Sequence, residues 1–236
     1  MSKFYEALKR HHTSTVEVLT PPKWASRAQR PIVSALESAY ELVQRQVATV
    51  GHGLVLQFVA PSRGEGATTL SNAFAQLAAS AGDLRVLLVD ADRTQLSTAT
   101  NFGCNTDQGI YDEMLLRNRI DGGLVAQRGN DRLNVGVLCG RRSPALVRKS
   151  LVPVYEQFRA NFDLTILDCP AVFSEGFFEL LPEVADGVLM VVQAEHSRPA
   201  VIRHAHSRLE ATGAKIFGAV LNRRHRYIPD FIYRLL

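Results

Sequence analysis

The 236-residue chain contains few cysteines and lysines, and it has no long apolar run. Its three cysteines show no Cys-x-x-Cys spacing, which favours a reducing compartment and argues against a cysteine metal site. No apolar run approaches the roughly 18 residues that a membrane-spanning helix needs. The first residues, MSKFYEALKRHH, include several charges and no apolar segment of the signal-peptide type. These absences predict a cytoplasmic protein.

Charge is distributed unevenly along the chain, although the net value is only +4. Residues 1–30 contain six Lys or Arg against two Glu, and residues 196–236 contain eight against two acidic residues. The body between these ends is therefore acidic. Basic ends would suit an anionic membrane, a nucleic acid or an acidic partner, and they would equally serve solubility alone.

Short apolar segments alternate with helical patterns over most of the chain. Six β-branched, apolar runs predict strands: 54–60, 85–90, 133–138, 163–168, 187–193 and 216–221. Apolar residues at helical spacing predict helices at 34–47, 68–80, 108–117, 144–161, 174–184 and 199–212. Strands that alternate with helices of this length pair in parallel. The pattern predicts one doubly wound α/β domain, with a mostly parallel sheet and helices on both faces.

Three segments are expected along the chain. Residues 1–33 would form an N-terminal extension, with a short docking helix at Lys3–Arg10 and a proline-rich tether. Residues 34–222 would form the α/β domain. Residues 223–236 would form a basic tail with apolar residues at near-helical spacing, suited to an anionic membrane or to a groove on the same domain or a partner.

A glycine-rich loop follows the first predicted strand and leads directly into a helix. The loop reads Pro61-Ser62-Arg63-Gly64-Glu65-Gly66-Ala67-Thr68-Thr69. Two glycines in such a turn let backbone N–H groups converge on an anion, and the helix N-terminus adds its dipole. The hydroxyl of Thr68 would be placed to ligate Mg²⁺. An ordinary turn in which Thr68 caps the helix would show the same residues.

Carboxylates stand at the ends of two further predicted strands. Asp90 and Asp92 follow one apolar run, and Asp168 ends another. Ligands of parallel sheets bind at the carboxyl ends of the strands, and a carboxylate there is costly unless a cation or a hydrogen-bond network receives it. Together with the glycine loop, these acids predict a magnesium–nucleotide site. No structural metal is expected, because His204 and His206 point to different faces of a predicted helix.

The motifs together resemble a known group of proteins. Gly-Glu-Gly-x-Thr-Thr at residues 64–69, LLVDAD at 87–92, FDLTILDCP at 162–170 and GAVLNRR at 218–224 are similar to segments of the bacterial tyrosine kinases of capsule and exopolysaccharide synthesis. Those kinases are P-loop proteins related to the MinD/ParA ATPases, so the resemblance implies a P-loop NTPase-like fold.

The resemblance also implies roles for individual residues. Mg-ATP or Mg-ADP would be the cofactor, and Thr68, Asp90 and Asp168 would hold the metal. Asp90 and Asp92 would be the catalytic acids if the protein is active. Asn222 falls where related ATPases contact adenine. The implied nucleotide-binding residues are Arg63, Gly64, Glu65, Gly66, Ala67, Thr68, Thr69 and Asn222.

The chain departs from the family at positions that carry the chemistry. Ala67 stands where the family has the phosphate-binding lysine, and Ser62 occupies the position of the signature lysine of the MinD branch. A P-loop lysine reaches the β- and γ-phosphates, and alanine supplies neither donor nor charge. Arg63 and Arg93 are the best candidates for a substitute cation.

Two features that the family uses for phosphorylation and assembly are weak as well. Only Tyr227 and Tyr233 stand where the family has a cluster of phosphorylated tyrosines. In the helix that the family uses for self-assembly, Ser38, Glu41 and Gln44 occupy the expected contact positions. A homo-oligomer therefore stays an open expectation.

The leading hypothesis is a degenerate kinase relative that acts as a regulatory or scaffolding subunit of polysaccharide synthesis and export. It would bind a membrane co-polymerase that controls chain length, at the cytoplasmic side of the inner membrane. One alternative is an active ATPase or autokinase that uses Arg63, Arg93 or a cation in trans. Another is a positioning protein of the MinD/ParA type, although nucleic acid is not an expected partner.

Overall fold

A computed structural model describes residues 30–81, 84–120, 124–127, 130–143, 148–180 and 182–223. The predicted helix at Lys3–Arg10, the tether and the tail after residue 223 lie outside these residues, as do Tyr227 and Tyr233. None of the described helices is long and apolar enough to cross a membrane.

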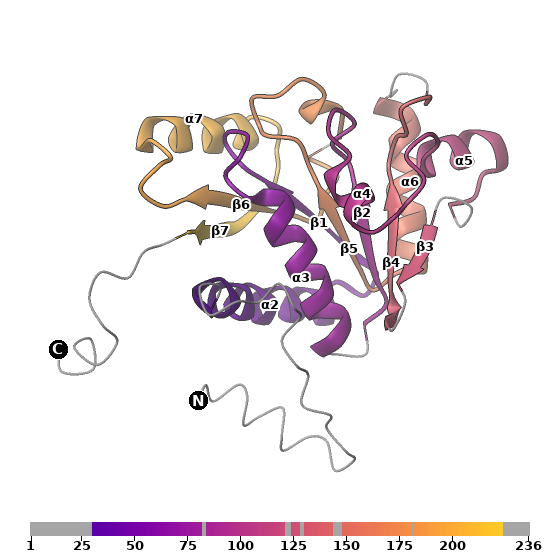
Figure 1. Ribbon diagram of the computed structural model, residues 1–236, viewed down its shortest axis with the longest axis horizontal. Helices are drawn as coiled ribbons and strands as arrows, with labels where there is room; N and C mark the ends of the chain where they lie inside the picture. Colours follow the sequence, from indigo (N-terminus) through magenta and orange to yellow (C-terminus); the bar gives the residue numbers. More distant parts are fainter. Residues whose placement is uncertain are drawn as a thin grey trace, which may run out of the picture.

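A seven-stranded sheet forms the centre of the domain (Figure 1). All neighbouring strands pair in parallel except one antiparallel pair at an edge, β3 with β4. In spatial order the strands are β3 (Leu124–Gln127), β4 (Asn130–Val137), β2 (Val86–Asp90), β5 (Leu164–Asp168), β1 (Leu54–Val59), β6 (Gly187–Gln193) and β7 (Ile216–Asn222). The prediction of a mostly parallel sheet is confirmed.

Helices cover both faces of the sheet, because each central strand is apolar on both sides. On β1, Leu54, Leu56 and Phe58 belong to the core on one face, and Val55 and Val59 belong to the core on the other. The first core includes residues of α2 (Arg30–Val50) and α3 (Ala67–Ala81). The second includes residues of α5 (Ile110–Arg117), α6 (Arg148–Asn161) and α7 (Pro199–Glu210).

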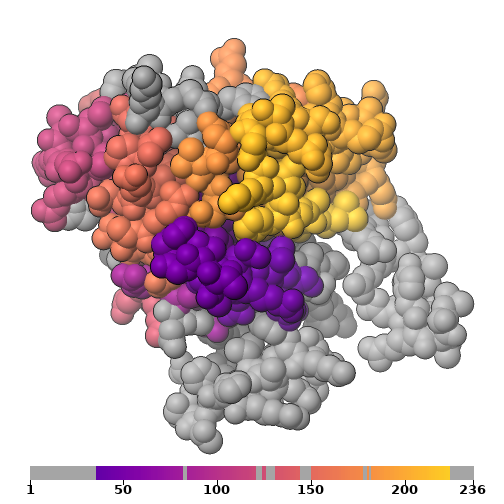
Figure 2. All heavy atoms as spheres, turned by 180° about the vertical axis from the view of Figure 1, so that it is seen from behind, coloured from indigo at the N-terminus to yellow at the C-terminus, as the bar shows by residue number. Residues whose placement is uncertain are grey.

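Helix α2 carries the apolar stripe that the sequence predicts, and it begins at Arg30, before the expected start at Ser34. Leu36, Tyr40 and Val43 are buried in the core shared with α3. The helix ends before Gly51, whose φ of +71° is a conformation that glycine adopts without strain. From behind, α2 lies below the C-terminal part of the domain (Figure 2), in line with its packing against β7.

The helix predicted at 174–184 is wrong. The structure has only a short 3₁₀ helix there, η3 (Phe177–Leu180). The carbonyl oxygen of Leu180 accepts hydrogen bonds from Gln57 Nε2, at 2.9 Å, and from the Tyr155 hydroxyl. Because tertiary partners occupy this carbonyl, it is unavailable to continue a helical ladder. Two further short elements were not predicted from the sequence: strand β3 and helix α4 (Ser97–Asn101).

Candidate nucleotide site

The loop between β1 and α3 turns tightly at two glycines. Gly64 and Gly66 have φ values of +83° and +99°, which other residues rarely adopt. A Cβ atom at Gly66 would lie 2.1 Å from Nδ2 of Asn222, so only glycine fits there. The helix starts immediately afterwards, with the N–H of Leu70 donating to the Gly66 carbonyl at 3.0 Å. The loop therefore presents its backbone and the N-terminus of α3 at the carboxyl edge of the sheet.

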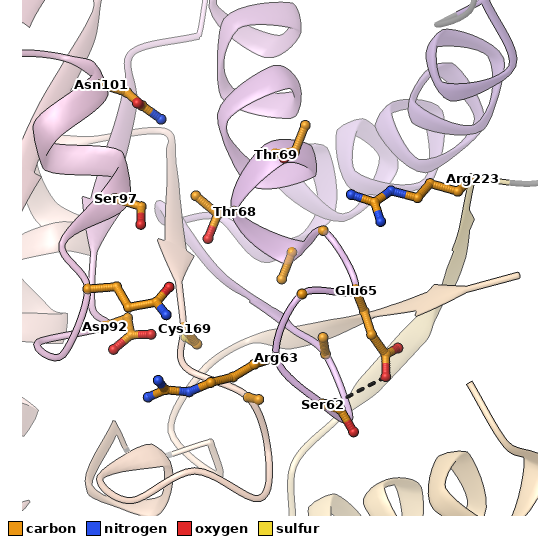
Figure 3. A pocket seen from close by; sticks show the side chains of 16 residues that line it. Ser62, Arg63, Glu65, Thr68, Thr69, Asp92, Ser97, Asn101, Cys169 and Arg223 are labelled. Atoms are coloured by element: carbon orange, nitrogen blue, oxygen red, sulfur yellow. Dashed lines mark hydrogen bonds between the residues drawn. The ribbon is translucent and has the colours of Figure 1, made fainter. Parts of the chain in front are cut away.

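The carboxylate of Glu65 holds this loop in shape. It is buried, with Oε1 accepting from the N–H of Ser62 at 3.2 Å (Figure 3). Oε2 accepts from the Ser197 hydroxyl at 2.7 Å and from the N–H of Gln193 at 3.3 Å. These donors fasten the loop to the end of β6. The structure thus uses the Glu65 side chain to position the loop that the sequence predicts to bind nucleotide.

A cavity of about 370 Å³ opens over the loop, within the size range of small-molecule sites. Eight of the predicted site residues line it: Arg63, Gly64, Glu65, Gly66, Ala67, Thr68, Thr69 and Asp92. Three predicted site residues are not part of its wall: Asp90, Asp168 and Asn222. The sequence analysis assigned no site role to several other lining residues: Gln95, Ser97, Asn101, Cys169 and Arg223.

Asp90 and Asp168 form a buried carboxyl pair beside the cavity. They end β2 and β5, are opposite each other in the parallel register, and are each 1% exposed. Both Asp90 oxygens accept backbone N–H groups, from Asp92 at 3.1 Å and from Ala99 at 2.9 Å. One Asp168 oxygen lies 2.6 Å from the Thr98 hydroxyl, but its Oδ1 accepts no hydrogen bond from the described residues.

Burial raises the pKa of both carboxyls. The pKa of Asp90 rises to about 6, mainly through desolvation, although the backbone N–H groups lower it. The pKa of Asp168 rises to about 7, again mainly through desolvation, with the negative charge of Asp90 adding to the shift. The hydroxyl of Thr98 lowers the pKa of Asp168 in part. Full ionisation of both carboxyls near neutral pH is therefore unfavourable unless a cation is bound beside them.

These residues fit a magnesium ion. Mg²⁺ prefers oxygen ligands and takes one or two from a protein that binds a nucleotide. Oδ1 of Asp168 is buried and accepts no hydrogen bond from the described residues, and Thr68 presents a hydroxyl in the cavity, close enough to lower the pKa of Asp168. Asp90 differs, because its two oxygens already serve to fix the loop after β2. Of the three predicted metal ligands, Thr68 and Asp168 are the two that fit a ligand role.

Two arginines line the cavity, Arg63 and Arg223, and Arg93 does not. Arg63 donates to the hydroxyls of Thr94, at 2.8 Å, and Ser174, at 3.4 Å. Arg93 instead donates to the carbonyl of Ser143 and is not part of the cavity wall. Arg223 lines the cavity from the end of β7. The sequence analysis placed Arg223 in the basic tail, since its position in a basic run gave no signal of the site.

Asn222 and Cys169 are two further buried residues at the site. The Asn222 amide is buried, and its Nδ2 donates to the Glu65 carbonyl at 2.8 Å, so it supports the loop from behind. Cys169 is buried at the cavity wall, and burial raises the pKa of its thiol well above the ordinary value. The thiol therefore stays protonated at neutral pH and is a poor nucleophile.

Solved structures define the class of fold. The kinase domain of the Escherichia coli tyrosine kinase ETK matches with a TM-score of 0.68 and 17% identity, over 97% of this chain and 91% of that one. The cell division protein MinD of Aquifex aeolicus matches with a TM-score of 0.56 and 22% identity, over 77% of this chain and 73% of that one. The domain thus has the P-loop fold of MinD and of bacterial tyrosine kinase domains.

Sequence relatives point to the kinase branch of this fold. CpsD of Streptococcus agalactiae serotype III, a tyrosine-protein kinase, is 28% identical over 182 residues, which are 75% of this chain and 77% of CpsD. The tyrosine-protein kinase YwqD of Bacillus subtilis is 25% identical over 223 residues, which are 92% of this chain and 90% of YwqD. No protein-family model matches the chain. The chain is a relative of the bacterial tyrosine-protein kinases.

One relative is much longer than the chain. EpsB of Ralstonia solanacearum is 29% identical over 195 residues, which are 81% of this chain but only 26% of EpsB. The chain thus spans about a quarter of the length of this relative.

Proposed function

We propose that the chain is a catalytically degenerate relative of the bacterial tyrosine kinases that binds a magnesium nucleotide and turns it over weakly or not at all. One observation carries the proposal: Ala67 lines the cavity of about 370 Å³. It stands at the loop position where the kinases that this chain resembles have lysine. Its methyl group supplies neither a hydrogen-bond donor nor a charge. Preorganised charges at a departing phosphoryl group are worth about 10²–10³ in rate. Their loss therefore reduces turnover more than it reduces nucleotide binding.

The other residues around the cavity support nucleotide binding. The glycine loop, the N-terminus of α3 and the hydroxyl of Thr68 face one cavity, and the Asp168 carboxyl lies beside it. Mg²⁺, when bound, would neutralise charge on the terminal phosphates. The loop N–H groups would hold the phosphate oxygens, since backbone donors at a helix N-terminus bind anions without a lysine.

The cellular role follows the resemblance of the chain to the kinases of capsule and exopolysaccharide synthesis. In this proposal the chain is a regulatory or scaffolding subunit of the export machinery. It docks on a membrane co-polymerase that controls chain length, at the cytoplasmic side of the inner membrane. The tail at 223–236 would add contact with anionic lipid or with the partner.

Restoring the lysine tests the proposal. The Ala67→Lys variant should raise Mg-ATP hydrolysis by about two orders of magnitude, because the missing charge returns inside the cavity. Phosphate release is the measurement, and Ala67→Met is the matched control, since it adds similar length without charge. Ala67→Lys with no gain in ATP binding or in hydrolysis would contradict a site that lacks only its lysine.

One observation favours a second candidate, an active ATPase or autokinase. The guanidinium of Arg63 already lines the cavity and hydrogen-bonds to hydroxyls. If it replaces the lysine, the unmodified chain should hydrolyse Mg-ATP, and Arg63→Ala should reduce the rate about a hundredfold. A phosphotyrosine assay with the membrane partner and Mg-ATP present tests the kinase version, and a blank result would refute it.

A further inference from the structure

Arg223 occupies an unusual backbone position at the rim of the cavity. It is the first residue after β7, and its φ of +54° lies in the left-handed region that residues other than glycine seldom adopt. The preceding residue, Asn222, is buried and supports the loop from behind. Strained backbone of this kind costs about 1–3 kcal/mol and persists where the surroundings impose it, as they do at ligand sites. The turn at Arg223 brings its side chain to the cavity.

The Arg223 guanidinium reaches toward the start of α3 (Figure 3). Its only hydrogen bond among the described residues is from Nη1 to Oε1 of Gln193, at 3.3 Å, and none of the ion pairs found there includes it. The backbone N–H of Gln193 in turn donates to Glu65, which holds the loop. A long bond to a neutral amide is weak, so an anion in the cavity would compete with it at little cost.

Arg63 approaches the same cavity from the opposite side of the loop (Figure 3). Its hydrogen-bond partners are the hydroxyls of Thr94 and Ser174, which carry no charge. The cavity is therefore flanked by two guanidinium groups, at the loop whose position 67 has lost its positive charge.

We propose that Arg223 binds the phosphate groups of a nucleoside di- or triphosphate, and that with Arg63 it forms a two-arginine clamp in place of the missing lysine. This inference rests on the proposed nucleotide binding and specifies the cation that allows it. A guanidinium presents a planar fork of donors to two phosphate oxygens at once. Because the two arginines reach the cavity from different loops, they hold the polyphosphate from both sides without occupying the space above Ala67.

The test is equilibrium binding of ATP, ADP and inorganic tripolyphosphate to the full chain in the presence of Mg²⁺. Tripolyphosphate has no base, so it isolates contacts to phosphate. The Arg223→Ala variant should bind all three ligands about 10- to 100-fold more weakly, as expected for the loss of hydrogen bonds to a charged group. Arg223→Lys should recover part of this loss. Arg85→Ala is the matched control, because Arg85 pairs with Asp163 outside the cavity.

A rescue experiment separates charge replacement from any other effect of Arg223. In the Arg223→Ala background, Ala67→Lys should restore binding of tripolyphosphate, since either cation satisfies the same oxygens.

Three results would overturn the inference. The first is unchanged affinity of Arg223→Ala for all three ligands while the unmodified chain binds them, which would leave the proposed function intact. The second is weaker binding of ATP with unchanged binding of tripolyphosphate, which would assign Arg223 to the base. The third is no binding by the unmodified chain at millimolar ligand, which would overturn the proposed function as well.

Discussion

Replacing Asp168 by asparagine should make the protein more stable at alkaline pH, although it removes a predicted metal ligand. Asp168 is 1% exposed, its Oδ1 accepts no hydrogen bond from the described residues, and Asp90 stands opposite it on the next strand. Burial raises its pKa from 3.8 to about 7. An asparagine of the same shape stays neutral at every pH and avoids the cost of ionising there.

The magnitude follows from the two pKa values. Between pH 3.8 and about 7 the folded protein holds a proton that the unfolded chain has lost, so raising the pH favours unfolding. The difference of about three pH units, at about 1.4 kcal/mol per unit, gives ~4 kcal/mol when the carboxyl is fully ionised. The advantage of Asp168→Asn over the unmodified chain should therefore be small near pH 4.5 and approach that value at pH 8.5.

Urea unfolding at a series of pH values, without nucleotide or Mg²⁺, measures this advantage. Asp163→Asn, immediately before the same strand, is the matched control, because Arg85 lowers the pKa of Asp163. The stability contributed by the Arg85–Asp163 pair is fully present above the ordinary pKa of an aspartate. It is lost only as the pH falls through the lowered pKa of Asp163. The cost of Asp163→Asn should therefore be constant from pH 5 to 8.5. A constant difference for Asp168→Asn over the same range would refute the reasoning.

Three further changes test the loop and the core by chemical denaturation. Gly66→Ala should lower the free energy of unfolding more than Gly64→Ala does. Both residues have positive φ, but only a Cβ at position 66 would meet Asn222, so equal losses of stability would contradict this contact. Glu65→Gln should cost about 1–3 kcal/mol, because one buried oxygen that accepts a backbone N–H becomes a donor. An unchanged midpoint would show that the loop does not depend on this carboxylate. Phe74→Ala should cost about 3–5 kcal/mol, since the ring is fully buried, and a loss below 1 kcal/mol would mean that the core refills the space.

Much of the fold and of the site could be predicted from local sequence. The six predicted strands all exist, because buried parallel strands are short apolar runs bounded by turns. The glycine loop could be predicted because its turn needs positive φ angles at residues 64 and 66. Glycine adopts such angles without strain, so this local requirement is visible in the sequence as two glycines. The carboxyls of Asp90 and Asp168 were expected to meet, since parallel strands end at one edge of the sheet.

The failures occurred where contacts made outside the segment decide its structure. The segment at 174–184 has a helical pattern, but Gln57 and Tyr155 bind the carbonyl of Leu180 and limit it to a 3₁₀ turn. The four-residue strand β3 is too short to show a period, and it forms by pairing with β4. No local pattern indicates the contact between Gln57 and a carbonyl 123 positions further along the chain.

The sequence by itself determined the class of fold, the glycine-rich loop and the alanine at position 67. These features depend on backbone conformation and on residue type, which are local properties. Only the tertiary structure decided which charges face the cavity. Arg93 is next to a predicted acid in the chain but bonds to Ser143, whereas Arg223 lies 156 positions after Ala67 and lines the same cavity. The physical reason is that the order of strands in the sheet fixes which strand ends lie beside the cavity. A long side chain such as Arg223 can reach the cavity only if its own strand ends there.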